Sequence, residues 1–316
     1  MPFPRLFGTT SNMKSPQKPK PKLVVVLGPT SSGKSDLAVL IAKKFNGEVV
    51  SADSRQVYRG MDIGTGKVTK KEMAGIPHHL LDVADPKRKY SVAHFKRDAE
   101  KAIANIQKRG KLPILCGGTG FYIQAVVDGL ILPEVKPNPK LRKELEKLST
   151  KELFARLKKM DSRRAKEIDR DNPHRLIRAI EIATELGKVP ELKTTPESTY
   201  DTLQIGIETN DIVLQTRIHN RLLKRMKRGM LAEVKRLHDE GVSWRRLEGL
   251  GLEYKHLALY LQGKLKKDEM LELLELAIVH YAKRQKTWNK KDPRTKWVSF
   301  EDTAKTYGLV KDFLGT

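Results

Sequence analysis

Cysteine is almost absent from the chain, which has a single one, Cys116, among its 316 residues. One cysteine cannot form a disulfide within the chain, and it cannot build a cysteine-based zinc site. Cys116 ends the apolar run Leu112–Cys116, where we expect a small buried side chain. The scarcity of cysteine is typical of proteins of a reducing compartment, and we expect a cytoplasmic location.

Long apolar runs are also missing, since no stretch approaches the ~20 residues that cross a bilayer. The N-terminal region lacks the apolar segment of a secretory signal. We therefore expect no membrane partner. A hydrophobic content of 39% is ordinary for a folded protein, and a chain of this length can bury a large core in one or two domains.

Acidic residues are few relative to basic ones. The chain has 38 Asp and Glu against 62 Lys and Arg, a net charge of +24, and its pI is about 9.9. Such an excess favours a polyanionic partner, nucleic acid before an anionic membrane, although a general bias toward lysine is the alternative. Residues 1–21 carry cations and prolines but no acid, and we expect them to form a disordered basic tail.

What the sequence does contain is a phosphate-binding loop. The apolar strand Leu23–Leu27 runs into Gly-x4-Gly-Lys-Ser, and a helical pattern follows. Backbone N–H groups of such a loop converge on a phosphate, Lys34 would add a charge, and Ser35 Oγ could bind Mg²⁺. The predicted phosphate ligands are Gly28, Thr30, Ser31, Ser32, Gly33, Lys34 and Ser35. Because ATP-binding and other nucleotide-binding loops share this spacing, the loop alone does not identify the ligand.

Strand and helix patterns alternate along the first third of the chain. Strands are expected at Gly47–Asp53, Leu112–Cys116 and Gln204–Glu208, and helices at Ser91–Arg109, 211–240, 251–262 and 267–290. This order predicts an α/β fold, namely a P-loop NTPase-like parallel sheet flanked by helices, with a mainly helical insertion domain. We expect the P-loop core domain, with its helical C-terminal part, over 22–132 and 199–316, and the insertion over 133–198.

Two further strand ends carry polar residues that could share a site with the phosphate loop. Asp53 follows a strand end, where it could bind magnesium or act as a general base, or could simply cap the local turn together with Ser54. The strand Leu112–Cys116 ends in glycines and Thr119, with none of the carboxylates that nucleotide hydrolases use to organise Mg²⁺ and water. The sequence therefore favours transfer chemistry over hydrolysis.

Cationic segments leave several interpretations open. Arg175 and Arg178 lie one turn apart near a helix start, on a face that could also be a solvated surface of ion pairs. Several cations crowd 217–228, and an arginine there could neutralise a leaving pyrophosphate. The segment Tyr281–Lys291 interleaves cations with aromatic rings, which suits RNA, although the rings could instead form one core stripe.

Seven separated segments, taken together, resemble the tRNA dimethylallyltransferase (tRNA isopentenyltransferase) family, in its bacterial type. They occur in the family's order over roughly residues 22 to 300, and the second and the last are far more specific than the phosphate loop. The segments are Gly28–Ser35, Asp53–Lys67, Pro77–Asp82, Tyr90–Phe95, Gly117–Ile123, Asn172–Arg175 and Tyr281–Trp288.

The resemblance implies transfer of a dimethylallyl group from dimethylallyl diphosphate to N6 of the adenosine on the 3′ side of the anticodon, in tRNAs that read codons beginning with U. It implies Mg²⁺ as cofactor, and the anticodon stem-loop of tRNA and the prenyl diphosphate as partners of a monomer. It also explains a phosphate loop without a hydrolytic carboxylate, because the loop would hold the donor's diphosphate. The insertion over 133–198 would clasp the anticodon stem.

The same resemblance implies roles for individual residues. Asp53 would take the proton from the adenine amino group, Arg217 would stabilise the leaving pyrophosphate, and Thr119 belongs with them in the catalytic set. The implied tRNA-binding residues are Asp53, Ser54, Arg55, Gln56, Thr119, Arg142, His174, Arg175, Arg178, Tyr254, Lys255, Lys283 and Arg284. The chain departs from the family's pattern at Glu253, where many members have glycine. Two rival functions are a P-loop small-molecule kinase, which binds ATP without RNA, and a non-catalytic RNA-binding module.

Overall fold

The structure is a computed structural model of the whole chain, and it describes residues 19–195 and 199–316. Most of the tail predicted over 1–21, and the last three residues of the predicted insertion, lie outside the described residues. The chain divides into two compact units. Unit 1 consists of Met1–Lys89, Lys101–Gly120 and Thr199–Thr316, and unit 2 consists of Tyr90–Glu100 and Phe121–Ser198.

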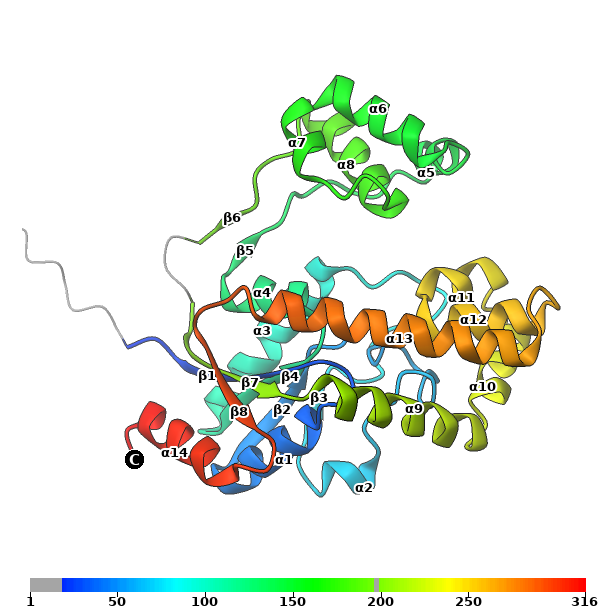
Figure 1. Cartoon of the computed structure of the whole chain (residues 1–316). Coiled ribbons are helices and arrows are strands. Elements are labelled where there is room, and N and C mark those ends of the chain that lie inside the picture. Colours follow the sequence, from blue (N-terminus) through cyan, green and yellow to red (C-terminus); the bar gives the residue numbers. More distant parts are fainter. Residues whose placement is uncertain (1–18, 196–198) are drawn as a thin grey trace, which may run out of the picture. The chain divides into compact units, whose positions relative to one another are not determined.

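Unit 1 is built on a six-stranded sheet whose paired strands all run parallel, in the order β3-β2-β4-β1-β7-β8 (Figure 1). The strands are β1 (Lys22–Leu27), β2 (Gly47–Ser51), β3 (His78–His79), β4 (Leu112–Gly117), β7 (Asp201–Glu208) and β8 (Thr295–Ser299). The inner strand β1 pairs with β4 on one side and β7 on the other, with Val26 opposite Cys116 and Ile205. The loop after β1 therefore leaves the carboxyl edge of the sheet at an inner strand, and ligands of such folds bind at this edge.

The inner strands β1 and β4 are rich in apolar residues because the sheet is covered on both faces. Strands β2 and β4 are buried at every residue, and β1 is buried at every residue after Lys22. A parallel strand buried on both faces needs an unbroken apolar run rather than an alternating pattern. The predicted α/β fold with a parallel sheet flanked by helices is confirmed, and Cys116 is a buried free thiol as expected.

The helices of unit 1 correct one prediction. The single helix expected over 211–240 is two helices, because α9 ends at Lys227 and Gly229, with φ of +93°, turns the chain before α10. Strand β8 and helix α14 were not predicted. The helices of this unit are α1 (Lys34–Lys44), α2 (Lys70–Met73), α9 (Asp211–Lys227), α10 (Met230–Asp239), α11 (Trp244–Leu250), α12 (Leu252–Leu261), α13 (Lys267–Asn289) and α14 (Thr303–Leu314).

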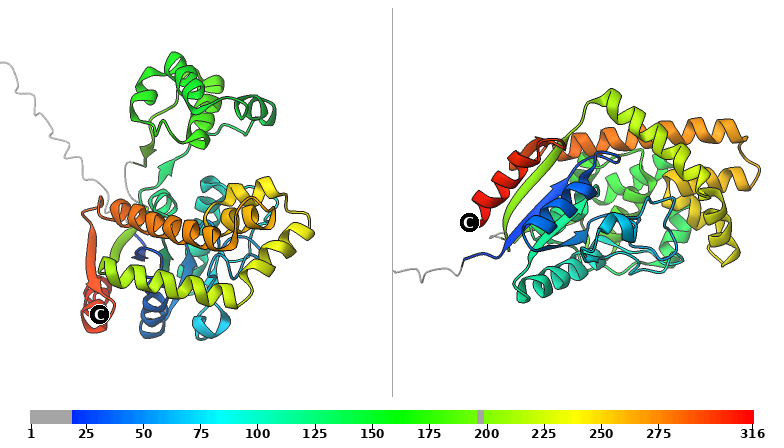
Figure 2. Two further views of the ribbon diagram at one scale, coloured as in Figure 1. Left: turned by 45° about the vertical axis from the view of Figure 1, so that its right-hand side comes forward. Right: turned by 90° about the horizontal axis from the view of Figure 1, so that it is seen from below.

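Helices α1 and α14 cover one face of the sheet (Figure 2). Leu37 and Ile41 of α1 and Val310 of α14 are fully buried in one cluster with apolar residues of β1, β2, β4, β7 and β8. This packing fixes the start of α1 against the end of β1, which sets the position of the phosphate loop between them. Helices α9 and α13 lie side by side, and His219 Nδ1 of the first is 2.9 Å from Glu275 Oε2 of the second.

Unit 2 is mainly helical. It contains α5 (Pro139–Leu145), α6 (Thr150–Met160), α7 (Ser162–Glu167), α8 (Pro173–Leu186) and a short antiparallel pair, β5 (Leu130–Ile131) with β6 (Lys193–Thr194). Helices α3 (Val92–Lys108) and α4 (Gly120–Val127) contribute to both units. Leu153 and Leu157 of α6 and Leu176 and Ile180 of α8 are fully buried in the core of this unit. No helix in the described part of the chain is long and apolar enough to span a membrane.

Candidate active site

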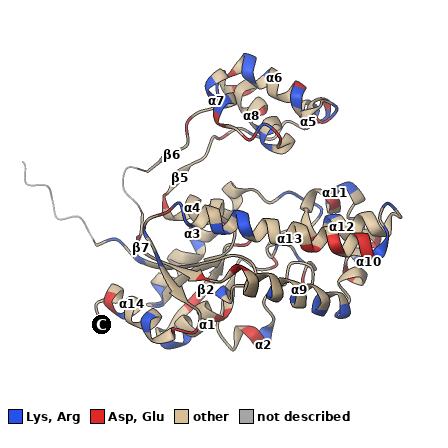
Figure 3. Ribbon diagram, in the orientation of Figure 1, with Lys and Arg blue, Asp and Glu red and all other residues tan. Residues whose placement is uncertain are grey.

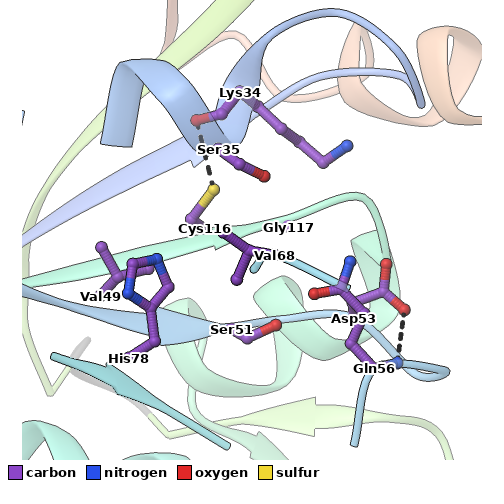
Figure 4. Close-up of a pocket in the computed structure, with 10 residues that line it drawn as sticks. All are labelled: Lys34, Ser35, Val49, Ser51, Asp53, Gln56, Val68, His78, Cys116 and Gly117. Carbon is purple, nitrogen blue, oxygen red and sulfur yellow. Dashed lines mark hydrogen bonds between the residues drawn. The ribbon is translucent and has the colours of Figure 1, made fainter. Parts of the chain in front are cut away.

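A pocket opens at the carboxyl edge of the sheet in unit 1. It is lined by Lys34, Ser35, Val49, Ser51, Asp53, Gln56, Val68, His78, Cys116 and Gly117 (Figure 4). The lining combines a lysine, hydroxyls and a carboxylate with the apolar side chains of Val49 and Val68. A pocket of this kind can hold a charged group and a small apolar group at the same time.

The phosphate loop between β1 and α1 has the backbone of an anion-binding site. Ser31 and Gly33 both have positive φ, +64° and +91°, and a Cβ on Gly33 would lie 2.9 Å from the ring of Phe300. Gly33 is the N-cap of α1 and makes no side-chain cap, so the first N–H groups of the helix stay open to a ligand. Ser32 Oγ is buried and has no hydrogen-bond partner within the described residues, and a bound anion is one kind of group that satisfies such a donor.

Lys34 and Ser35 begin α1 and line the pocket. Burial lowers the pKa of Lys34, and the charges of Arg221 and Arg225 lower it further, while Cys116 and Asp53 have the opposite effect. Lys34 Nζ donates to the backbone carbonyl of Pro29 at 3.3 Å. A cation whose hydrogen-bond acceptor is a neutral carbonyl, and not a carboxylate, is stabilised when an anionic ligand binds beside it.

Asp53 has a structural role and still lines the pocket. Its Oδ1 accepts the backbone N–H groups of Arg55 at 2.8 Å and Gln56 at 3.2 Å, which is the capping role that the sequence left open. Within the part of the chain that the structure describes, Oδ2 takes no hydrogen bond. The N–H of Ser54 donates to Thr119 Oγ1 at 3.1 Å, so the ends of β2 and β4 are joined beside the carboxylate.

Arg221, which the sequence did not single out, carries a charge that acts on Lys34 of the phosphate loop. Its Nη2 donates to the carbonyl of Gly66 at 3.3 Å, and its charge acts on both Lys34 and Asp53. Burial, together with the charge of Arg225, lowers the pKa of Arg221 to about 10. Arg217, the predicted pyrophosphate ligand, is 3.8 Å from Glu301. The signal for Arg221 was its spacing of four residues from Arg217, which puts both on one side of α9.

Arg225, four residues after Arg221 on α9, forms a largely buried ion pair with Glu253. Arg225 Nη1 lies 3.0 Å from Glu253 Oε1, and the two side chains are 10% and 12% exposed. Burial raises the pKa of Glu253, while the charges of Arg225 and Arg221 oppose that rise. The same Nη1 also donates to the carbonyl of Gly64 at 3.3 Å.

The structure corrects the prediction for Tyr254. This side chain is 1% exposed, and its hydroxyl donates to Glu233 Oε1 at 2.8 Å. Glu233 also accepts the N–H groups of Asp62, Ile63 and Gly64 at 2.7 to 2.9 Å. Tyr254 is therefore part of the support of the loop 62–64 and has no exposed surface to offer an RNA, whereas Lys255 beside it is exposed.

The end of α13 adds aromatic and cationic groups to the same unit. Tyr281 is hydrogen-bonded to Thr119, and burial raises its pKa to about 12. Lys283 and Arg284 are exposed, and the guanidinium of Arg284 lies 5.8 Å from the ring centre of Tyr281. Trp288 is 40% exposed, so the two rings do not form one buried stripe.

In unit 2, two of the three predicted tRNA-binding arginines, Arg142 and Arg178, form ion pairs with the buried carboxylate of Glu181. Arg142 Nη2 is 2.7 Å from Glu181 Oε2, and Arg178 Nη1 binds the same oxygen. Arg178 Nη2 donates to the carbonyl of Val135 at 2.9 Å. His174 and Arg175, at the start of α8, are exposed. Basic residues occur on the helices of both units (Figure 3), and the predicted tRNA contacts in unit 2 stay a prediction.

The phosphate loop follows an inner strand of a parallel sheet, and a carboxylate lies in the same pocket. These features place the chain in the class of P-loop α/β proteins. The IPP transferase family model matches residues 56–292. The chain is 44% identical over 270 residues to tRNA dimethylallyltransferase 1 of Geotalea daltonii, covering 84% of this chain and 85% of the relative. It is 45% identical over 282 residues to tRNA dimethylallyltransferase 2 of Citrifermentans bemidjiense, covering 89% and 90%. The chain belongs to the IPP transferase family.

Solved structures agree with this assignment. The full-length tRNA isopentenylpyrophosphate transferase of Bacillus halodurans has a TM-score of 0.72 and 37% identity, covering 94% of this chain and 97% of that one. A eukaryotic dimethylallyltransferase acting on tRNA has a TM-score of 0.78 and 28% identity, covering 93% and 80%. None of these relatives is a kinase, so the rival function gains no support from them.

Proposed function

We infer that the protein transfers a dimethylallyl group from dimethylallyl diphosphate to N6 of the adenosine 3′ to the anticodon, in tRNAs that read codons beginning with U. The observation that carries this function is that Lys34 and Ser35 of the phosphate loop share one pocket with Asp53. A diphosphate and a proton acceptor are the two features that such a transfer needs. The names of the curated relatives supply the class of substrate.

In the transfer, the bond between C1 of the prenyl group and the diphosphate oxygen breaks, and its electron pair leaves with the diphosphate. The bond between C1 and adenine N6 forms, and N6 loses a proton. Because the N6 lone pair is delocalised into the ring, a carboxylate within reach helps by orienting the amino group and accepting that proton. Asp53 fits this role, since its Oδ1 accepts the N–H groups of Arg55 and Gln56, while no described residue donates to Oδ2.

Charge develops on the diphosphate as it leaves, and stabilising that charge is the main electrostatic task. The loop from Gly28 through Thr30, Ser31, Ser32 and Gly33 to Ser35 supplies N–H groups and hydroxyls, and Lys34 and Arg221 supply positive charge. Arg217, whose Nη2 lies 3.8 Å from Oε1 of the exposed Glu301, stays a predicted ligand.

Magnesium fits the hard oxygen donors of this pocket. Among the described residues no group of three or more His, Cys, Asp or Glu side chains could hold a metal. Mg²⁺ commonly keeps waters and binds substrate phosphates with only one or two protein ligands, so a site of few protein donors suits it. Ser35 Oγ would hold the ion, which neutralises diphosphate charge when bound.

The acceptor RNA would meet several of the predicted residues. Ser54, Arg55, Gln56 and Thr119 surround Asp53 and would contact the extruded adenine, whose removal from its stack costs a few kcal/mol. Lys255, Lys283 and Arg284 are exposed cations suited to phosphates. We place Arg142, His174, Arg175 and Arg178 of the insertion on the anticodon stem. The working form that we propose is a cytoplasmic monomer.

Incubation of the protein with Mg²⁺, radiolabelled dimethylallyl diphosphate and unmodified tRNA tests this function. Label should enter the tRNA and appear as N6-(dimethylallyl)adenosine after nuclease digestion, without added ATP. Label that stays out of the tRNA, together with ATP consumption on a small acceptor, would contradict the proposal in favour of a kinase.

The Asp53→Asn variant tests the assigned base. It should bind tRNA as the parent does and transfer about 10² to 10⁴ times more slowly, the usual contribution of a general base. Equal transfer rates for variant and parent would remove Asp53 from the mechanism.

A further inference from the structure

Helix α13 carries a buried glutamine, Gln285, that touches two loops of the proposed site. Gln285 is 6% exposed, and its carboxamide uses both of its ends. Its Oε1 accepts the backbone N–H of Thr30 in the phosphate loop at 2.8 Å. Its Nε2 donates to the backbone carbonyl of Gly118, in the loop after β4, also at 2.8 Å.

The contact with the second loop is tight enough to require a glycine there. A Cβ at position 118 would lie 2.1 Å from Gln285 Nε2, so any larger residue would push the carboxamide away. One residue further on, Thr119 accepts the N–H of Ser54 at 3.1 Å and donates its own N–H to Ala52 at 3.2 Å. The carboxamide is therefore the link between the phosphate loop and the segment that carries Asp53.

We propose that Gln285 is a positioning residue that fixes the diphosphate loop relative to the loop that presents the acceptor base. The inference rests on the proposed transferase function and deepens it. Gln285 carries no charge and moves no proton, and its use is geometric. Transfer requires C1 of the prenyl group to face N6 along the breaking bond, and a displacement of about 1 Å can cost about a hundredfold in rate.

The chemistry of the side chain also explains why glutamine serves here. Its partners are one N–H and one carbonyl, and an amide offers one acceptor and one donor to match them. A glutamate would keep the acceptor for Thr30 but turn an oxygen toward the carbonyl of Gly118. A methionine has a similar size and offers neither strong hydrogen bond.

The Gln285→Met variant tests the proposal in steady-state transfer with the full-length protein. We expect kcat to fall about a hundredfold, while the KM for dimethylallyl diphosphate and the affinity for inorganic pyrophosphate and for tRNA change less than about threefold. A merely structural residue would lower the melting temperature without this split between kcat and KM.

Gln204→Met is the matched control, because Gln204 is also a buried glutamine of unit 1 and bonds to Asp292 Oδ2 at 2.9 Å. It should lose stability and keep its kcat per folded molecule. Gly118→Ala is a second variant that leaves Gln285 in place and displaces its carboxamide, so it remains informative if Gln285→Met does not fold. It should reproduce the loss of kcat.

Three outcomes separate the ideas. If the parent is active and Gln285→Met or Gly118→Ala has the same kcat as the parent, the positioning role is overturned. A loss of pyrophosphate affinity as large as the loss of kcat also overturns it, because Gln285 would then be needed to form the diphosphate site itself. A parent protein that transfers no label at all contradicts the proposed function instead.

Discussion

Each unit contains a largely buried carboxylate paired with arginine. The two clusters differ in how many of their cations pair with that carboxylate. In unit 2, Glu181 takes hydrogen bonds from Arg142, Arg178 and the N–H of Asn138, so its carboxylate is fully used. In unit 1, Arg225 is the one described cation at salt-bridge distance from Glu253. Lys34 and Arg221 donate to backbone carbonyls instead.

The difference shows what distinguishes a structural cation from one available to a ligand. Removing a charge from water is costly unless it is paired, so a half-buried cation with only a carbonyl partner is stabilised by an incoming anion. Lys34 and Arg221 have that arrangement beside the phosphate loop. Arg142 and Arg178 already pair with a carboxylate, and their contact with the anticodon stem stays a prediction.

The largest effect that would sharpen this comparison is expected at Arg221. Arg221→Met should lower the single-turnover rate of transfer by about 10² to 10³, the typical loss of one donor to a developing anion. Arg217→Met is the control on the same helix and should stay within about tenfold of the parent, because the Arg217 side chain is 40% exposed and solvent screens its charge. Reversed sizes of the two effects would restore Arg217 as the pyrophosphate ligand.

The second effect concerns stability in unit 2. Glu181→Ala should lower the free energy of unfolding by about 3 kcal/mol, because it leaves Arg142 and Arg178 without the carboxylate that they share. Chemical denaturation measures this loss, and pyrophosphate affinity should stay unchanged. A change in pyrophosphate affinity as large as that of an Arg221 variant would break the distinction between the clusters.

A smaller effect is expected when Glu253 is neutralised. Glu253→Gln removes a negative charge that acts on Arg221 and Asp53, so inorganic pyrophosphate should bind about three- to tenfold more tightly. Glu248→Gln, on the neighbouring helix α11, is the control and should leave that affinity unchanged. Weaker binding in Glu253→Gln would mean that Glu253 mainly orients Arg225.

The smallest effect is a pH dependence in unit 2. Burial alone would raise the pKa of Glu181, but hydrogen bonds from Arg142, Asn138 and Arg178 hold it below its ordinary value of 4.5. Its contribution to stability is therefore full above pH 4.5 and is lost as the pH falls below that value. Unfolding free energies measured between pH 6 and about pH 3 should fall less steeply in Glu181→Gln than in the parent. Glu185→Gln, on the exposed side of the same helix, should follow the parent.

The parts of the molecule that depend on local sequence signals were predictable. The run Leu23–Leu27 and the glycine spacing after it gave β1 and the phosphate loop, and Gly110 ended α3 where expected. The break at Gly229 was missed because cations and apolar residues keep a helical spacing across it. Strand β8 was missed because five residues with a lysine and a serine have little apolar pattern of their own.

Site residues that follow the end of a strand could be proposed from the sequence. Site residues that depend on contacts between distant segments could not. Asp53 and Thr119 follow strand ends, and the parallel sheet brings their segments together, since the N–H of Ser54 donates to Thr119 Oγ1. Gln285 is separated in the sequence from Thr30 by 255 residues and from Gly118 by 167 residues, and no local spacing encodes these contacts. The burial of Tyr254 depends on Glu233, which lies in another helix.

Calorimetric titration of inorganic pyrophosphate with Mg²⁺ tests the central claim most directly, that cations without a carboxylate partner mark the diphosphate site. The parent, Arg221→Met and Arg142→Met would be compared at equal fractions of folded protein. We expect pyrophosphate to bind the parent, to bind Arg221→Met about 10 to 100 times more weakly, and to bind Arg142→Met as it binds the parent. Equal losses in both variants, or a loss in Arg142→Met alone, would contradict the account.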